Sequence, residues 1–80
     1  MEQQTTLTSG QISIMINAQI KDMVTWLMED FKYSLAEALD CVYNSELFEK
    51  LQDLSTGLYF QRSSYNYELL KDEMKYGKIA

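Results

Sequence analysis

The 80-residue sequence contains no histidine, no proline and a single cysteine, Cys41. Without histidine, one chain can build neither a Ser-His-Asp triad nor the usual tetrahedral zinc site. A single cysteine can pair only with another molecule, so no intramolecular disulfide stabilises the fold. Cys41 has no adjacent cation in the sequence to favour its thiolate, and the neighbouring Asp40 disfavours it. We therefore expect no enzymatic activity, no metal and no cofactor, with Cys41 as a half-buried core residue.

Basic residues and long apolar runs are also scarce. Seven basic residues against twelve acidic ones give a net charge of −5, which repels phosphate backbones and anionic membranes. No run approaches the roughly 18 to 20 apolar residues that span a bilayer. The amino-terminal MEQQTTLTSG lacks the basic start and apolar core of a secretion signal. The sequence therefore predicts a cytoplasmic protein whose principal partner is neither nucleic acid nor a membrane.

Only three glycines interrupt the chain, and 46% of its residues are hydrophobic. Continuous helices joined by short turns have this composition. We therefore predict an all-α fold, a small three- or four-helix orthogonal bundle, with residues 1–7 flexible and residues 8–80 forming a single helical domain. A chain of this size buries only about 60 to 65 percent of its unfolded surface, so its stability depends on close helix packing or on self-association.

The longest apolar-periodic stretch predicts a first helix that ends at Phe31. Thr8 and Gln11 match a capping box at its start. Apolar residues recur every three or four positions along one face: Ile12, Ile16, Ile20, Met23, Val24, Leu27 and Phe31. Three further large side chains lie outside this stripe: Ile14, Trp26 and Met28. They either widen the buried face or are exposed for a partner.

A second capping box, formed by Ser34 and Glu37, predicts a second helix. Helical spacing continues after it through Leu35, Leu39, Val42 and Tyr43. Asn44 and Ser45 favour turns and caps, so we predict a break there and a third short helix from Glu46 to Leu54. The alternative is one uninterrupted helix over residues 35–54, because Leu39, Tyr43, Leu47 and Leu51 also keep an i, i+4 spacing.

Gly57 predicts a stop, and residues 58–60 predict an extended or single-turn connector that anchors on the core. Ser63 or Ser64 is expected to cap the last helix, with Glu68 near its start and Gly77 at its end. Tyr67, Leu70 and Met74 share one face of that helix. Two surface ion pairs are expected from the spacing: Glu46 with Lys50, and Asp72 with Lys75.

Aromatic side chains are the feature of this sequence that most favours a binding function. The candidate interaction residues are Trp26, Tyr59, Phe60, Arg62, Tyr65, Tyr67 and Tyr76. Aromatic and arginine side chains dominate the energetic centres of protein interfaces. Two or three of these rings can equally complete a small core, because tyrosine is intermediate in burial.

Four short motifs carry a resemblance to a known group of proteins. They are S-L-A-E-A-L at residues 34–39, Y-N-S-E-L-F at 43–48, T-G-L-Y at 56–59 and Y-N-Y-E-L-L at 65–70. Through them the segment from Val24 to Met74 resembles short, uncharacterised bacterial helical proteins that are common in gut bacteria. Some of those are encoded beside a partner that resembles an ADP-ribosyltransferase, as in a toxin and antitoxin pair. The resemblance implies a binding role and brings no catalytic residue.

The leading hypothesis is a non-enzymatic protein-interaction module that binds another protein, which the resemblance implies is a toxin-like enzyme. Self-association into a homo-oligomer accompanies this hypothesis, because the core is small and aromatic side chains are in excess. The alternative is an acidic mimic of nucleic acid that blocks the basic groove of a protein from a mobile element. That alternative requires the carboxylates to gather on one face.

Overall fold

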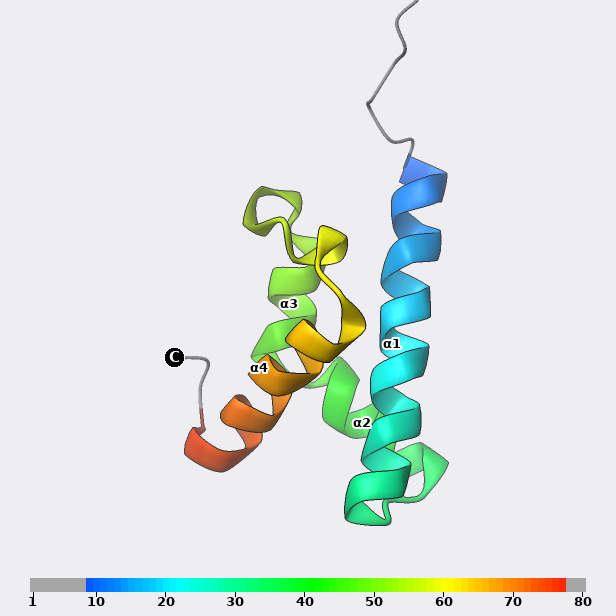
Figure 1. Ribbon diagram of the computed structural model, residues 1–80, viewed down its shortest axis with the longest axis vertical. Coiled ribbons are helices and arrows are strands. Elements are labelled where there is room, and N and C mark those ends of the chain that lie inside the picture. The colour runs from blue at the N-terminus through cyan, green and yellow to red at the C-terminus, as the bar shows by residue number, and fades with distance from the viewer. Residues whose placement is uncertain (1–8, 78–80) are drawn as a thin grey trace, which may run out of the picture.

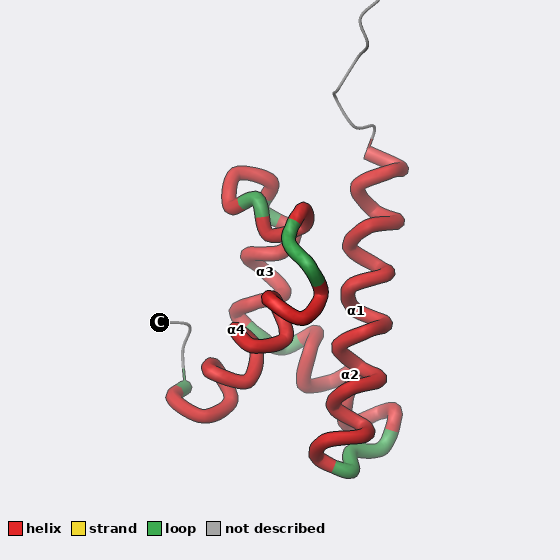
Figure 2. Tube along the Cα trace, in the orientation of Figure 1, coloured by secondary structure: helices red, strands yellow, loops and turns green. Residues whose placement is uncertain are grey.

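The computed structural model describes residues 9–77, and this part of the chain is helical, with no strand. Four α-helices, α1 (Ser9–Phe31), α2 (Leu35–Tyr43), α3 (Glu46–Gln52) and α4 (Ser63–Tyr76), are accompanied by two 3₁₀ turns, η1 (Leu54–Thr56) and η2 (Leu58–Phe60). Figure 2 shows the short loops that join these helices. The prediction of a small all-α bundle is confirmed. The predicted flexible residues 1–7 and the predicted cap at Thr8 lie outside the described residues.

Helix α1 forms one side of the molecule; α2, η2 and α4 pack against it, and α3 packs on α2, η2 and α4 (Figure 1). All four α-helices and η2 contribute to one core, whose buried apolar residues are Ile20, Met23, Val24, Leu27, Ala38, Val42, Leu47, Leu51, Leu58, Tyr67 and Leu70. The middle of the predicted α1 stripe is therefore buried. Phe31, at its carboxyl end, remains 42% exposed, and Ile14, outside the stripe, is 69% exposed.

The turn between α1 and α2 is set by two local features. Lys32, just after α1, takes a left-handed conformation, with φ of 60°. Helices often end with a residue in this conformation, and that residue is usually glycine. Ser34 then forms the predicted capping box: its hydroxyl accepts from the Glu37 amide at 3.1 Å, and the Glu37 carboxylate accepts from the Ser34 amide at 2.8 Å. This reciprocal cap fixes the first residue of α2.

The helix is interrupted at Asn44 and Ser45, between α2 and α3, so the alternative of one continuous helix is wrong. The Ser45 hydroxyl accepts from the Phe48 amide at 3.0 Å and donates to the Val42 carbonyl at 2.6 Å. The Ser45 hydroxyl therefore caps α3 and also provides a hydrogen-bond donor to the Val42 carbonyl near the end of α2. Helix α3 ends at Gln52, two residues before the predicted Leu54.

The connector from α3 to α4 follows the predicted single-turn form. Gly57 takes a left-handed conformation, with φ of 70°, and lies between η1 and η2. Leu58 inserts into the core from η2, Tyr59 is half-buried against the core, and Phe60 is exposed.

The start of α4 differs from its prediction. Neither Ser63 nor Ser64 is the cap, because Arg62 occupies the N-cap position and makes no side-chain cap hydrogen bond. The Ser63 hydroxyl instead donates to the Asp22 carboxylate of α1 at 2.7 Å. Glu68 lies beyond the first turn. The Ser63 hydroxyl therefore bonds to a residue 41 positions away in the sequence instead of capping α4.

A buried amide pair joins α1 to α4 and to η2. The Gln19 amide group donates to the carbonyls of Tyr59 at 3.0 Å and Gln61 at 2.8 Å, and more weakly to Leu58 at 3.3 Å. Fully buried Asn66 donates to the Gln19 side-chain oxygen, and to the Leu58 carbonyl at 2.9 Å. Buried side-chain amides are normally hydrogen-bonded, and here the hydrogen bonds of Gln19 and Asn66 fix the position of η2 against α1.

Ion pairing was only partly predicted. The Glu46–Lys50 pair forms at 3.7 Å, as expected. Within residues 9–77, Asp72 and Lys75 make no ion pair, and the pair on α4 is instead Lys71 with Glu68, at 3.0 Å. Both pairs are at the surface, where such pairs contribute little to stability.

No helix within the described residues is both long and apolar enough to span a bilayer.

Candidate functional site

The aromatic residues proposed from the sequence are distributed over several parts of the structure. Trp26 of α1 packs on Tyr67 of α4, with ring centroids 5.2 Å apart. Tyr67 is 6% exposed and donates to the Asp30 carboxylate at 2.7 Å, while Trp26 is half-buried. These two rings therefore belong to the α1–α4 contact and its edge rather than to an open aromatic surface.

The other candidates lie further out. Tyr59 and Phe60 of η2 have ring centroids 4.4 Å apart, and Phe60 is more than half exposed. Arg62 and Tyr65 are exposed near the start of α4. Tyr76 is exposed near the other end of α4, about 16 Å along the helix axis from Tyr65 at 1.5 Å per residue. The structure thus brings η2 and the start of α4 together and leaves Tyr76 apart.

An apolar groove lies between α1 and α2. It has a volume of about 390 Å³ and is lined by Asn17, Ile20, Lys21, Val24, Thr25, Met28, Leu35, Leu39 and Tyr43. We call it the α1–α2 groove. Three of its apolar side chains remain substantially exposed: Leu35 at 56%, Tyr43 at 49% and Met28 at 37%.

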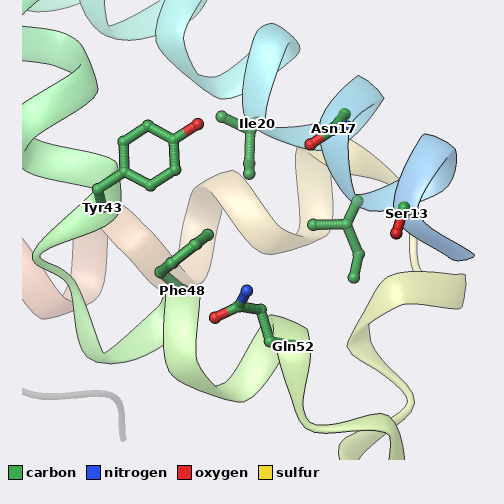
Figure 3. A pocket seen from close by; sticks show the side chains of 7 residues that line it. Ser13, Asn17, Ile20, Tyr43, Phe48 and Gln52 are labelled. Atoms are coloured by element: carbon green, nitrogen blue, oxygen red, sulfur yellow. The ribbon is translucent and has the colours of Figure 1, made fainter.

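The α1–α2 groove continues towards α3. A second pocket, of about 160 Å³, shares Asn17, Ile20 and Tyr43 with it and adds Ser13, Ile16, Phe48 and Gln52. Figure 3 shows Tyr43 and Phe48 facing the α1 side chains across this opening. The Tyr43 and Phe48 rings meet edge to face, with centroids 4.9 Å apart. We call this second pocket the α3 extension of the groove.

Helix spacing explains why the groove stays open. On α2, Ala38 and Val42 form the row that is buried in the core, while Leu35, Leu39 and Tyr43 form the next row, turned toward the groove. Two adjacent apolar rows give this nine-residue helix more apolar surface than α1 covers. The result is an apolar channel with α1 on one wall and the outer row of α2 on the other.

Charge is sparse in this channel. Lys21 is the only charged residue among those that line the α1–α2 groove and its α3 extension. Within residues 9–77, its ammonium makes no ion pair. The groove therefore carries one uncompensated positive charge within an acidic protein.

Another pocket lies between the end of α1 and α4, lined by Phe31, Lys71, Met74 and Lys75. The Lys71 ammonium there is already paired with Glu68 and lies 4.9 Å from the centroid of the Tyr67 ring. One of its two cations is therefore occupied within the chain. This makes it a weaker binding candidate than the α1–α2 groove.

The arrangement around Cys41 does not favour nucleophilic chemistry. Burial raises the pKa of the Cys41 thiol, and the nearby Glu73 carboxylate raises it further. A raised pKa leaves less thiolate at neutral pH. As predicted, the side chain is half-buried against the core. In the described part of the chain, no three acidic or cysteine residues are grouped so as to hold a metal ion.

Sequence reasoning missed the groove because it noted only the helical spacing of Leu35, Leu39, Val42 and Tyr43 and did not decide which of them face the core. The spacing of Leu35, Leu39 and Tyr43 is helical, but so is that of Ala38 and Val42, and only one of the two rows can face the core. The presence of two competing apolar rows on one short helix was the available signal.

Comparison with protein-family models, with curated proteins and with solved structures finds no match for this chain.

Proposed function

We propose that this protein is a non-enzymatic interaction module that binds another protein in the α1–α2 groove. The observation that carries the proposal is the partial exposure of Leu35, Tyr43 and Met28 around one continuous apolar channel. Clustered apolar side chains that stay exposed beside a groove are typical of sites where partners dock. Leu54 in η1 is also exposed, but it is not among the residues that line the groove.

The groove can contribute useful binding energy. Burying a large apolar side chain completely is worth about 1.5–3 kcal/mol, so covering three that are already half-buried is worth roughly 1 kcal/mol each. Their sum, about 3 kcal/mol, corresponds to a factor of more than 100 in affinity. These side chains would form the centre of an interface, and surrounding polar contacts would complete it.

The resemblance to bacterial proteins encoded beside an ADP-ribosyltransferase-like partner suggests which class of protein binds. On this proposal the chain acts as the neutralising member of a toxin and antitoxin pair, in the cytoplasm, and has no catalytic role. The raised pKa of the Cys41 thiol supports this, because it disfavours the most reactive side chain in the sequence.

The alternative, an acidic mimic of nucleic acid, receives less support from the positions of the carboxylates. Within residues 9–77, six of them accept internal hydrogen bonds: Asp22 and Asp30 of α1, Glu37 and Asp40 of α2, Asp53 after α3, and Glu73 of α4. They come from separate elements, whereas a mimic requires its acidic groups to gather on one exposed face.

The proposal is tested by co-expressing the chain with the protein encoded beside its gene, for which the resemblance implies an ADP-ribosyltransferase-like enzyme. We expect the two to co-elute in gel filtration and the partner's toxicity to growing cells to fall. Replacing Leu35 with glutamate should weaken both effects at least tenfold, because a carboxylate would have to be buried in the groove.

The matched control is Leu54→Glu, at a residue that is 51% exposed and lies outside the groove. Leu35→Glu should not unfold the chain, because Leu35 is the first residue of α2, where a negative charge is favourable. Loss of binding in both variants alike, or binding that neither variant changes, would contradict a site in the α1–α2 groove.

A further inference from the structure

The shape of the groove limits what can fill it. The α1 residues that line the groove and its α3 extension run from Ser13 to Met28, which is about 22 Å along the axis at 1.5 Å per residue. This length matches about four turns of a partner helix. The part between α1 and α2 is lined mainly by apolar side chains, while the α3 extension also has Ser13, Asn17 and Gln52, so the apolar face of an amphipathic helix would lie against the α1–α2 part.

The charge of the groove limits the partner further. The protein has a net charge of −5, yet no acidic residue is among those that line the groove or its extension, and Lys21 is the only charge there. Its ammonium has no carboxylate partner within residues 9–77. A partner that covers the channel without a negative charge would leave this ammonium poorly solvated and unpaired, which is unfavourable.

A second copy of this chain fits the groove poorly. In a two-fold symmetric pairing, residues near the midpoint of the shared surface face their own copies. The midpoint of the α1 wall, between Ser13 and Met28, lies beside Lys21. Antiparallel pairing of two such walls would therefore bring two ammonium groups together, which opposes self-association through this face.

Building on the proposed function, we infer that the α1–α2 groove binds an amphipathic helix of a different protein, whose apolar face carries a glutamate or aspartate at its edge to pair with Lys21. Leu35, Leu39 and Tyr43 take the apolar side chains of that helix, and the Lys21 ammonium sets its register. The Lys21 pair selects acidic over basic helices, and the apolar contacts provide most of the affinity.

The test is a display library of 18-residue helical peptides, selected in parallel against the full chain and against its Lys21→Glu variant. Apolar residues are fixed at helical spacing on one face of each peptide, and the flanking positions are randomised. We expect peptides selected by the natural chain to carry an acidic residue at one fixed flanking position. Peptides selected by Lys21→Glu should carry lysine or arginine at that same position.

Selected peptides are then measured as synthetic peptides by titration calorimetry. An acidic peptide should bind Lys21→Glu at least tenfold more weakly than the natural chain, and Lys75→Glu, on α4, should stay within twofold of the natural chain. Leu35→Glu should weaken every peptide at least tenfold, with Leu54→Glu again within twofold. Circular dichroism confirms that each variant keeps its helix content.

The possible failures are distinguishable. Peptides that bind the natural chain and Lys21→Glu equally, but lose binding to Leu35→Glu, would overturn the acidic helix and leave the groove as the binding site. An absence of selected peptides, or binding insensitive to Leu35→Glu, would overturn the groove and the proposed function with it. A dimer of the natural chain that Leu35→Glu dissociates in sedimentation would identify a second copy as the occupant and overturn the inference.

Discussion

Replacing Gln19 with methionine should be one of the most destabilising changes that leaves the apolar core intact. Methionine has a similar length and fills the same space, but it provides no donor to the Tyr59 and Gln61 carbonyls, which Gln19 contacts at 3.0 and 2.8 Å. Asn66 also loses an acceptor for its amide group. The Leu58 carbonyl is less affected, because the Gln61 amide still donates to it at 3.0 Å.

The magnitude follows from these losses. Each unmade hydrogen bond at a buried group costs about 1–3 kcal/mol, and the Tyr59 and Gln61 carbonyls can recover part of it from water because their residues are not fully buried. We expect a loss of about 2–3 kcal/mol in the free energy of unfolding. For a domain of this size, that lowers the melting temperature by roughly 10–20 °C.

The assay is urea unfolding followed by circular dichroism, with Gln52→Met as the matched control. Gln52 is exposed at the end of α3, so its replacement should change the free energy of unfolding by no more than about 0.5 kcal/mol. Combining Gln19→Met with Asn66→Leu should cost less than the sum of the two single changes, because each removes the other's buried partner. Strict additivity, or an unchanged Gln19→Met protein, would refute this account of the amide pair.

Three further changes probe single contacts by the same unfolding assay. Glu73→Ala should cost about 1–2 kcal/mol, because the Glu73 carboxylate accepts from the first two amides of α3 at 2.7 and 3.0 Å; Asp72→Ala is its control, and equal effects would contradict the cap. Lys32→Gly should stabilise the protein by about 0.5–1 kcal/mol, since glycine accepts the left-handed conformation at φ of 60° without strain, and a loss of stability would contradict this. Burial raises the pKa of the Tyr67 phenol and its hydrogen bond to Asp30 raises it further, so the folded state holds a proton that the unfolded chain loses near pH 10, and stability should fall as pH rises above that point. Tyr67→Phe should cost about 1 kcal/mol at pH 7 and flatten this alkaline decline, and an equally steep decline in the variant would exclude Tyr67 as its source.

Local signals in the sequence predicted most helix boundaries correctly. Ser34 with Glu37, Ser45 and the two glycines at positions 57 and 77 each act through neighbours within a few residues, and each was found where its motif lies. Such signals need no knowledge of the rest of the fold.

The errors came where a distant residue decides the outcome. Ser63 or Ser64 was expected to cap α4, but Ser63 bonds to Asp22, and the polar Asn66 is fully buried with Gln19. Nothing within a few residues of either position indicates its partner. The groove was missed for the same reason, since the choice of which row of α2 faces the core depends on how α1 packs against it.

Four long-range hydrogen-bonded contacts end on α4. They join Gln19 to Asn66, Asp22 to Ser63, Asp30 to Tyr67, and Glu73 to the start of α3. During synthesis, therefore, the earlier helices emerge from the ribosome before the segment that closes them is available. Until then only the part of the apolar face of α1 that α2 and η2 cover has a partner, so the core is completed when α4 is present.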